Sequence, residues 1–363
     1  MTPHFPLNTH FGELLKNIRP PAHRIKLAQE LPPQVREYIK QNKDFPTLAP
    51  HSRLAGSYAQ KMGAGDVKDV DTLICVPGNP QKNEPEAKKL IRDLKKLLDG
   101  LPAYLRYEGS AEAQINVERA RRSIHVYFKD QDFQLDFVPC IAPDGFESMI
   151  YVPDRGFNKW IASHPIGYNN LLNELHQQHD RKVKPLGILL KHFRNYQMKN
   201  CQPKSYWLGA MLIHHIRSGS LDMDASLCVL FHDLLDSIHH QYDHLLWTST
   251  TATPNIPDPV LNHNVSWNWS RSHFETFMRW VEKGRSLAAK ALETDDRDKA
   301  ISCWQKIFGE EYFPSDVEVA ASNLANAGMP GNSLVQPNGL ILPSYAVSSF
   351  TTKSQPTKFH GIE

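Results

Sequence analysis

Two aspartates separated by one residue, Asp69 and Asp71, are well suited to metal chemistry. They belong to the strand-like run Asp69–Ile74, and side chains alternate between the two faces of a β-strand, so both carboxylates are expected on one face. Mg²⁺ prefers such hard oxygen ligands and usually keeps water or substrate phosphates in its coordination shell. The pattern predicts a site for a metal–triphosphate complex, although an Asp-x-Asp pair on a strand is also often a cap, an ion-pair partner or a solvent-facing feature.

A glycine–serine pair, Gly56 and Ser57, precedes these aspartates. If the chain turns here from a strand at Arg53–Ala55 into a helix that starts at Tyr58, free backbone N–H groups and the serine hydroxyl would face a terminal phosphate. Gly-Ser is also a common turn, so the pair alone carries little information. Beside a metal site, it indicates transfer of a nucleotidyl group.

A third carboxylate, Asp136, lies between apolar residues in the strand-like run Phe133–Pro139. A buried, unpaired carboxylate is costly, so Asp136 is expected to share a cation with Asp69 and Asp71 on a neighbouring strand. Three such acids can hold two Mg²⁺ ions, one that activates the attacking hydroxyl and one that neutralises the leaving pyrophosphate. Mn²⁺ is expected to substitute for Mg²⁺.

This order of motifs resembles that of the polymerase-β-like nucleotidyltransferases. Within them it is most similar to the oligoadenylate synthase and cGAS/DncV-like branch (CD-NTases), whose bacterial members make cyclic di- and trinucleotides. The likeness extends over about residues 50 to 315. The further segments that match this branch, in the expected order, are Tyr151–Arg155 with Trp160, Ser163 and Pro165, then Leu189–Arg194, Lys204–Leu208, Asn255–Pro259 and Ala300–Gly309.

The resemblance implies roles for three residues in the second half of the chain. Lys191 and Ser205 would grip the donor triphosphate, and Tyr206 would stack on its base, which aromatic stacking achieves without selecting one base. From the residues alone, Lys191 could also be a solvated lysine, Ser205 a helix cap and Tyr206 a core aromatic.

One segment departs from the family pattern. Members often carry a basic residue and then a threonine shortly after Gly-Ser, whereas here Lys61 is followed by Met62. Lys61 can stand for the basic residue in binding nucleotide. Met62 cannot replace a hydroxyl, and Gly63 and Gly65 indicate a looser loop, so the phosphate contacts at this point differ from those of the family.

The residues and the resemblance together predict an enzyme, a metal-dependent nucleotidyltransferase. A ribose hydroxyl of the acceptor nucleotide attacks the donor α-phosphorus and pyrophosphate leaves. Repetition with ring closure, which only the resemblance implies, gives a cyclic oligonucleotide second messenger, as in bacterial anti-phage (CBASS) signalling. The expected substrates are nucleoside triphosphates, ATP and/or GTP, and the expected protein partners are regulators or effectors of a defence operon. The residues predicted to bind nucleotide are Gly56, Ser57, Lys61, Lys191, Ser205 and Tyr206, and those predicted to bind metal and carry catalysis are Asp69, Asp71 and Asp136.

Two other functions compete with this one. The first is a template-independent nucleotidyltransferase with another acceptor, such as a linear 2′-5′ oligonucleotide, an RNA end or a protein side chain. The second is a catalytically silent nucleotide-binding or RNA-binding scaffold, which the presence of all three acids disfavours.

The elements that must position these residues predict an α+β chain of two lobes with the active site in the cleft between them. We expect N-terminal helices and a polymerase-β-like catalytic lobe with a mixed sheet over residues 1–165, a helical lobe over 166–315 and an extended or partly disordered tail over 316–363. The predicted helices are Phe11–Ile18, Pro33–Gln41, Glu86–Leu98, Asn169–Gln178, Pro185–Met198, Tyr206–Arg217, Ser226–His239, His273–Glu293 and Asp298–Phe308.

Composition agrees with an enzyme of this kind. A chain of 363 residues is long enough for two lobes, and its net charge of +2 gives no strong sign of nucleic-acid binding. The five cysteines are scattered without metal-binding or disulfide spacing. The N-terminus lacks the pattern of a signal peptide and no run reaches the length of a membrane span, so we expect a cytoplasmic protein without a membrane partner.

Overall fold

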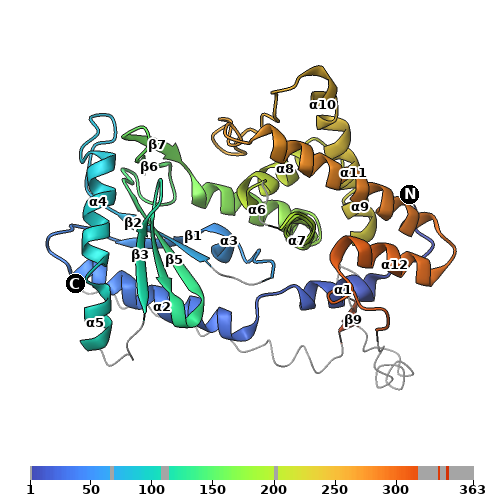
Figure 1. The fold of residues 1–363 in the computed structure, drawn as a ribbon, viewed down its shortest axis with the longest axis horizontal. Coiled ribbons are helices and arrows are strands. Elements are labelled where there is room, and N and C mark those ends of the chain that lie inside the picture. The colour runs from blue at the N-terminus through green and yellow to red at the C-terminus, as the bar shows by residue number, and fades with distance from the viewer. Residues whose placement is uncertain are drawn as a thin grey trace.

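The computed structural model describes residues 2–65, 69–107, 114–199, 203–317, 334–335 and 341–342. A sheet-containing part and a helical part lie side by side (Figure 1). The prediction for the tail, 316–363, falls almost entirely outside the described residues; those described there include two short paired strands, β8 (Leu334–Val335) and β9 (Ile341–Leu342).

A five-stranded mixed sheet forms the first part, with strand order β1-β2-β5-β4-β3. Strands β2 and β5 at its centre run parallel, and the other neighbours pair antiparallel. This confirms the predicted α+β class with a mixed sheet. The strands are β1 (Ser52–Ala55), β2 (Asp69–Cys75), β3 (Ile115–Arg119), β4 (Ile124–Phe128) and β5 (Phe133–Cys140).

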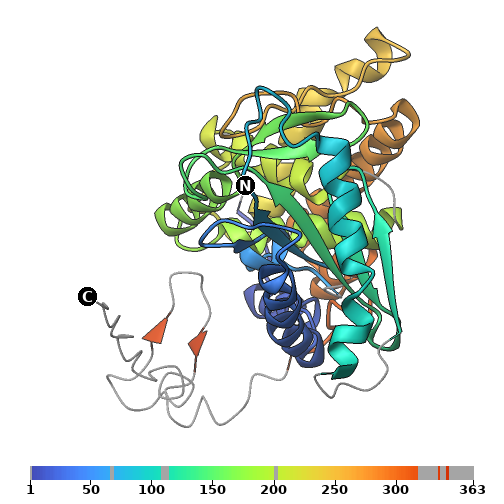
Figure 2. The same cartoon turned by 90° about the vertical axis from the view of Figure 1, so that its left-hand side faces the viewer.

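Three helices cover one face of this sheet: α2 (Ala22–Gln41), α4 (Ala87–Leu98) and α5 (Leu101–Tyr107). Figure 2 shows α4 lying along the strands. The alternate residues of the central strands, Val70 and Ile74 on β2 and Leu135 and Phe137 on β5, are buried against them. The intervening residues, which include the three aspartates, therefore belong to the opposite face.

Helix α2 is longer than the sequence predicts. The predicted start is Pro33, but the helix starts at Ala22 and runs through Pro32 and Pro33. Proline lacks an N–H group and costs a hydrogen bond in a helix interior. The helix continues because its buried residues, Ala28, Pro32, Val35 and Ile39, recur at helical spacing, and three of them pack into the core beneath the sheet.

A hairpin connects the two parts. Strands β6 (Ile150–Asp154) and β7 (Lys159–Ser163) pair antiparallel, and α6 (Pro165–Gln178) follows directly. A small apolar cluster joins the sheet to this junction: Leu73, Cys75 and Cys140 pack with Val152 of β6 and Ile166 of α6. The sheet face that carries the aspartates is thus covered by apolar packing at the end where β2 and β5 finish.

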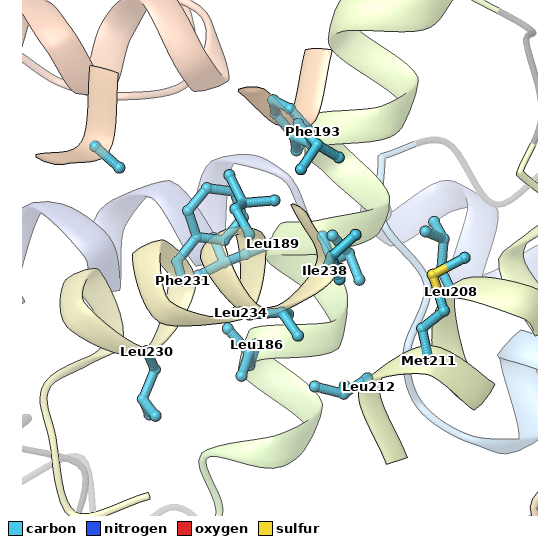
Figure 3. Close-up of a cluster of buried hydrophobic side chains, with 14 of the residues drawn as sticks. Leu186, Leu189, Phe193, Leu208, Met211, Leu212, Leu230, Phe231, Leu234 and Ile238 are labelled. Atoms are coloured by element: carbon cyan, nitrogen blue, oxygen red, sulfur yellow. The ribbon is translucent and has the colours of Figure 1, made fainter. Parts of the chain in front are cut away.

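The second part is helical, and the six helices predicted for it are all present, with ten of their twelve boundaries within two residues of the predicted ones. Leucines and aromatic residues of α7, α8 and α9 interdigitate at its centre (Figure 3). Among the described residues, no helix is both long enough and apolar enough to cross a bilayer. The helices after α6 are α7 (Val183–Met198), α8 (Ser205–Arg217), α9 (Leu227–Tyr242), α10 (His244–Thr248), α11 (Arg271–Glu293) and α12 (Arg297–Phe308).

The first helix, α1 (Asn8–Asn17), contributes to the helical core although it precedes the sheet in sequence. Phe11 packs edge-on against Trp304 and Phe308 of α12. In Figure 1 α1 accordingly lies beside α12, away from the sheet. The apolar periodicity of residues 11–18 predicts the helix but contains no information about which lobe it covers.

Candidate active site

The three predicted carboxylates lie on one face of the two parallel central strands. Asp71 of β2 and Asp136 of β5 are register partners, and Asp69 is the partner of Gln134. Asp69 is exposed, while Asp71 and Asp136 are half-buried. The structure therefore brings all three acids together, as the alternation of side chains along two strands predicts.

Burial and mutual repulsion govern the charge of this group. Burial, then the nearby Asp136 and Asp69, raise the pKa of Asp71 to about 7. Burial also raises the pKa of Asp136 to about 7, with a further contribution from Asp69 and against a hydrogen bond from Gln134. Without a cation, the pair resists full ionisation at neutral pH.

Two neighbours hold Asp136 in place. Gln134 Nε2 donates to Asp136 Oδ1 at 2.7 Å, and His125 Nε2 on the adjacent strand β4 lies 3.6 Å from Asp136 Oδ2. Neither Gln134 nor His125 was predicted from the sequence. The alternation that identified the acids also indicates Gln134, because this residue stands two positions before Asp136 on the same strand.

The three acids supply carboxylate oxygens, the ligand type that divalent Mg²⁺ prefers. In the part of the chain that the structure describes, no three His, Cys, Asp or Glu side chains are grouped so as to surround an ion by themselves. Mg²⁺ commonly takes only a few protein carboxylates and completes its shell with water and substrate phosphates. A cation would also relieve the repulsion that raises the pKa values of Asp71 and Asp136.

Gly56 packs directly against one of the acids. It has a positive φ of 66°, and a Cβ atom built on it would lie 1.8 Å from Asp71 Oδ2. Only glycine both accepts this backbone conformation and leaves room for the carboxylate. Gly56 and Ser57 begin the short helix α3 (Gly56–Ala59), which follows β1 directly, so the predicted strand-to-helix turn is present.

Lys191 reaches the same region from the helical part. It is buried on α7, and its Nζ donates to the carbonyl of Met62 at 3.2 Å. Burial and then the charge of Arg194 lower the pKa of Lys191 to about 8, while Asp69 opposes this shift. The ammonium group is therefore close enough to Asp69 to interact with it.

Lys61 points elsewhere. It is exposed, and its charge lowers the pKa of Lys184 on α7 after the larger effect of burial. Met62, which breaks the family pattern, is buried in the helical core, where its side chain occupies the space beside Gly187. The residue that cannot bind phosphate thus anchors the loop after α3 to α7.

Ser205 and Tyr206 begin α8, and each contacts a residue that the sequence analysis assigned no role. Arg194 of α7 donates to Ser205 Oγ at 3.0 Å. The Tyr206 hydroxyl donates to Asp258 Oδ2 at 2.6 Å. Arg194 and Asp258 both stand in segments that resemble the family, but neither spacing nor periodicity shows that they contact Ser205 and Tyr206.

Comparison with known sequences gives consistent matches. Residues 5–175 match the family described as the Second Messenger Oligonucleotide or Dinucleotide Synthetase domain. The cyclic AMP-AMP-AMP synthase of an Acinetobacter species is 26% identical over 350 residues, which make up 93% of this chain and 94% of the relative. A probable cyclic AMP-AMP-GMP nucleotide synthase of Salmonella paratyphi B is 26% identical over 169 residues, 46% of this chain and 43% of the relative.

The fold matches solved structures over most of its length. The CD-NTase CdnG of Bradyrhizobium diazoefficiens, solved with GTP, gives a TM-score of 0.60 at 16% identity and covers 89% of this chain and 99% of its own. CdnC of E. coli MS115-1, solved in a complex with HORMA-deltaN, gives a TM-score of 0.61 at 14% identity and covers 84% of this chain and 97% of its own. Residues 5–175 therefore form a Second Messenger Oligonucleotide or Dinucleotide Synthetase domain, and the fold of the chain is an α+β fold like that of the CD-NTases CdnG and CdnC.

Proposed function

We propose that the protein is a divalent-metal-dependent synthase of a cyclic oligonucleotide second messenger, with Asp69, Asp71 and Asp136 as its catalytic carboxylates. The observation that carries the proposal is the register pairing of Asp71 with Asp136 on parallel strands, beside Asp69 on the same sheet face. Enzymes of this family generally depend on a divalent metal. Two Mg²⁺ ions, or Mn²⁺ in their place, would supply Lewis-acid activation of the attacking hydroxyl and charge neutralisation of the leaving pyrophosphate.

The chain's own residues bind and orient the substrate. Asp71 and Asp136, whose pKa values are near 7 without a cation, provide the negative charge that holds metal at this face. Gly56 leaves the space that Asp71 occupies, and Ser57 with the adjacent amides would bind the triphosphate. Lys191 contributes a positive charge from the helical part.

Ser205 acts as a hydrogen-bond donor to the triphosphate. Arginine has no acceptor, so Ser205 Oγ must accept the bond from Arg194, and the hydroxyl hydrogen is left to donate to another group. A phosphate oxygen is the acceptor that the donor nucleotide offers. Tyr206 stacks on the base.

The substrates are nucleoside triphosphates, and we propose that ATP is among them. A relative that aligns with nearly the entire chain is named a cyclic AMP-AMP-AMP synthase, which supports an adenine-containing product. The role in anti-phage (CBASS) signalling, with regulatory or effector proteins as partners, rests on the family resemblance.

Pyrophosphate release from ATP and Mg²⁺ tests the assignment of the acids. The wild-type protein should release pyrophosphate, and Asp136→Asn should lower the rate by more than about 100-fold. Asp144→Asn is the matched control, because Asp144 is an exposed aspartate just beyond β5, and its rate should equal that of the wild type. An Asp136→Asn rate equal to that of the control would overturn the assignment.

A further inference from the structure

The hydroxyl group of Tyr206 is held by a hydrogen bond, while part of its ring is exposed. Tyr206 is the second residue of α8, and its hydroxyl donates to Asp258 Oδ2 at 2.6 Å, which connects the helix to a loop 52 residues later. Despite this contact, 37% of the residue is exposed. The hydroxyl end is therefore anchored while part of the ring surface remains available to a ligand.

Tyr168 of α6 restrains the ring from one direction. The two ring centroids lie 4.9 Å apart with an interplanar angle of 41°, and Tyr168 itself is buried. Tyr168 in turn packs against Gly209 of α8, where a Cβ atom would lie 2.1 Å from the Tyr168 hydroxyl oxygen. Tyr206 is thus held by its own helix, by Tyr168 and by Asp258.

Asp258 is itself immobilised. The side-chain Oδ1 of Asp258 accepts hydrogen bonds from the backbone N–H groups of Val260 and Leu261, at 2.8 and 2.9 Å. The backbone N–H of Asp258 donates to the carbonyl of His263 at 2.7 Å. Only 6% of the residue is exposed. Because Oδ1 is occupied by amides and Oδ2 by the tyrosine, Asp258 is not placed to read a nucleobase directly.

The loop that carries Asp258 is also attached to α8 at a second point. His214 Nε2 lies 2.8 Å from the carbonyl oxygen of Pro257. This contact fastens the same loop to the same helix without touching Tyr206. It makes possible a test that separates orientation of the tyrosine from attachment of the loop.

We infer that Asp258 is a positioning residue for nucleotide binding, which holds the Tyr206 ring in the orientation that stacks on the donor base. This inference rests on the proposed function in that it takes Tyr206 as the stacking residue. A ring fixed before binding loses little conformational entropy when the base arrives, so removal of its anchor weakens binding rather than chemistry. The effect is the same for ATP and GTP, because a stacked ring does not select a base.

Calorimetric titration with the α,β-methylene analogues of ATP and GTP, which cannot lose pyrophosphate, tests the inference in the presence of Mg²⁺ independently of turnover. Asp258→Ala should raise the dissociation constant roughly tenfold for both nucleotides, as expected for loss of a hydrogen bond to a charged group. Tyr206→Phe, which keeps the ring and removes the hydroxyl, should weaken binding in the same direction. His214→Ala, the matched control, should change the dissociation constant less than about twofold.

A double-variant comparison decides between positioning and a merely structural role. In a Tyr206→Ala background, Asp258→Ala should have no further effect on ATP binding, because the ring that it positions is gone. Equal losses in the two backgrounds, or a loss for His214→Ala as large as that for Asp258→Ala, would overturn the inference. Failure of the proposed function would be a different result: ATP would bind in this Asp258-dependent way, but no pyrophosphate would be released.

Discussion

Asp71 and Asp136 occupy the same register position of parallel strands, where two carboxylates repel each other unless a cation lies between them. Burial and this repulsion raise both pKa values to about 7. A group whose folded pKa lies above its unfolded value of 3.8 destabilises the protein progressively as pH rises from 3.8 to 7. The arrangement is therefore unfavourable for the metal-free protein and favourable for binding a cation.

Asp71→Asn should abolish nucleotidyl transfer and yet stabilise the metal-free protein. The free energy of unfolding should rise by on the order of 2 kcal/mol at pH 8, because asparagine carries no buried charge at this position and does not repel Asp136. The gain should shrink as the pH falls from 7 toward 3.8 and vanish below that, where the wild-type carboxyl is protonated in both states. Urea unfolding in the presence of a chelator measures it.

Two comparisons make this prediction specific. Asp69→Asn, which removes an exposed carboxylate, should give a smaller gain. Mg²⁺ should stabilise the wild type more than the Asp71→Asn variant. A pH-independent gain, or none, would contradict the account of the acid pair.

Gly56→Ala should remove activity through displacement of Asp71. The added Cβ would lie 1.8 Å from Asp71 Oδ2, so the carboxylate must move away from the strand face that it shares with Asp136. Gly219 is a matched control, since its φ of 71° is similar but nothing lies within 4 Å of its Cβ position. Both alanines should cost about 1 to 2 kcal/mol of stability from the backbone alone.

Pyrophosphate release distinguishes the two glycine variants. Gly219→Ala should keep the wild-type rate, whereas Gly56→Ala should lose at least about 100-fold, as if a catalytic carboxylate were removed. Similar rates for both variants would show that the close approach of Gly56 to Asp71 has no role in catalysis.

At the level of elements, periodicity predicted most of the fold. The alternation in residues 69–74 and 133–139 identified β2 and β5, and apolar spacing placed α4, α7 and α11 within a few residues of their observed bounds. The prediction for α2 began too late, at Pro33, whereas in the structure burial of the apolar stripe against the sheet outweighs the local cost of two prolines in the helix. Tertiary packing therefore determines where α2 starts, and no local sequence pattern predicts it.

The candidate site divides in the same way. Asp69, Asp71 and Asp136 could be predicted from strand periodicity, because alternation puts them on one face of their strands and neighbouring strands then bring the carboxylates together. Lys191, Ser205 and Tyr206 depended on the family resemblance. Contacts between separate elements, such as Arg194 with Ser205 and Tyr206 with Asp258, depend on helix docking and loop conformation, which the sequence pattern does not contain.

The β6–β7 hairpin is held by one buried carboxylate. Asp154 is fully buried and accepts hydrogen bonds from Arg121 Nε and from the backbone N–H groups of Gly156 and Phe157. Burial by itself would raise the pKa of Asp154, but the hydrogen bonds from Arg121 and Phe157 and the charges of Arg121 and Arg122 lower it. The tip of the β3–β4 hairpin is thereby attached to the junction between sheet and helices.

Asp154→Ala should lower the free energy of unfolding by about 2 kcal/mol at pH 7, measured with urea. Because the folded pKa is below the unfolded value of 3.8, the stabilisation is present above pH 3.8, and the difference between wild type and variant should shrink below it. Glu147→Ala, which removes an exposed ion pair with Arg53, should leave stability unchanged. An equally small effect for Asp154→Ala would contradict a structural role for the hairpin carboxylate.

In the whole molecule, the residues of the proposed site come from two parts that each have an apolar core of their own. One lies beneath the sheet and one is built from the helices, and α1 contributes to the second although it begins the chain. The carboxylates belong to the sheet, whereas Lys191, Ser205 and Tyr206 belong to helices α7 and α8. The sheet thus supplies the negative charges that would hold metal ions, and the helical part supplies a positive charge for phosphate and an aromatic ring for the base. This arrangement suits a nucleoside triphosphate.

Mass spectrometry of the products formed from the four ribonucleoside triphosphates with Mg²⁺ tests the central claim most directly. The account predicts an adenine-containing product that resists phosphatase and whose mass equals that of its nucleotide units joined in a ring, without a terminal phosphate. The same mixture with the Asp69→Asn, Asp71→Asn double variant should contain no such product. Products that phosphatase shortens, or transfer of label to a macromolecule instead, would contradict the claim of a cyclic oligonucleotide synthase.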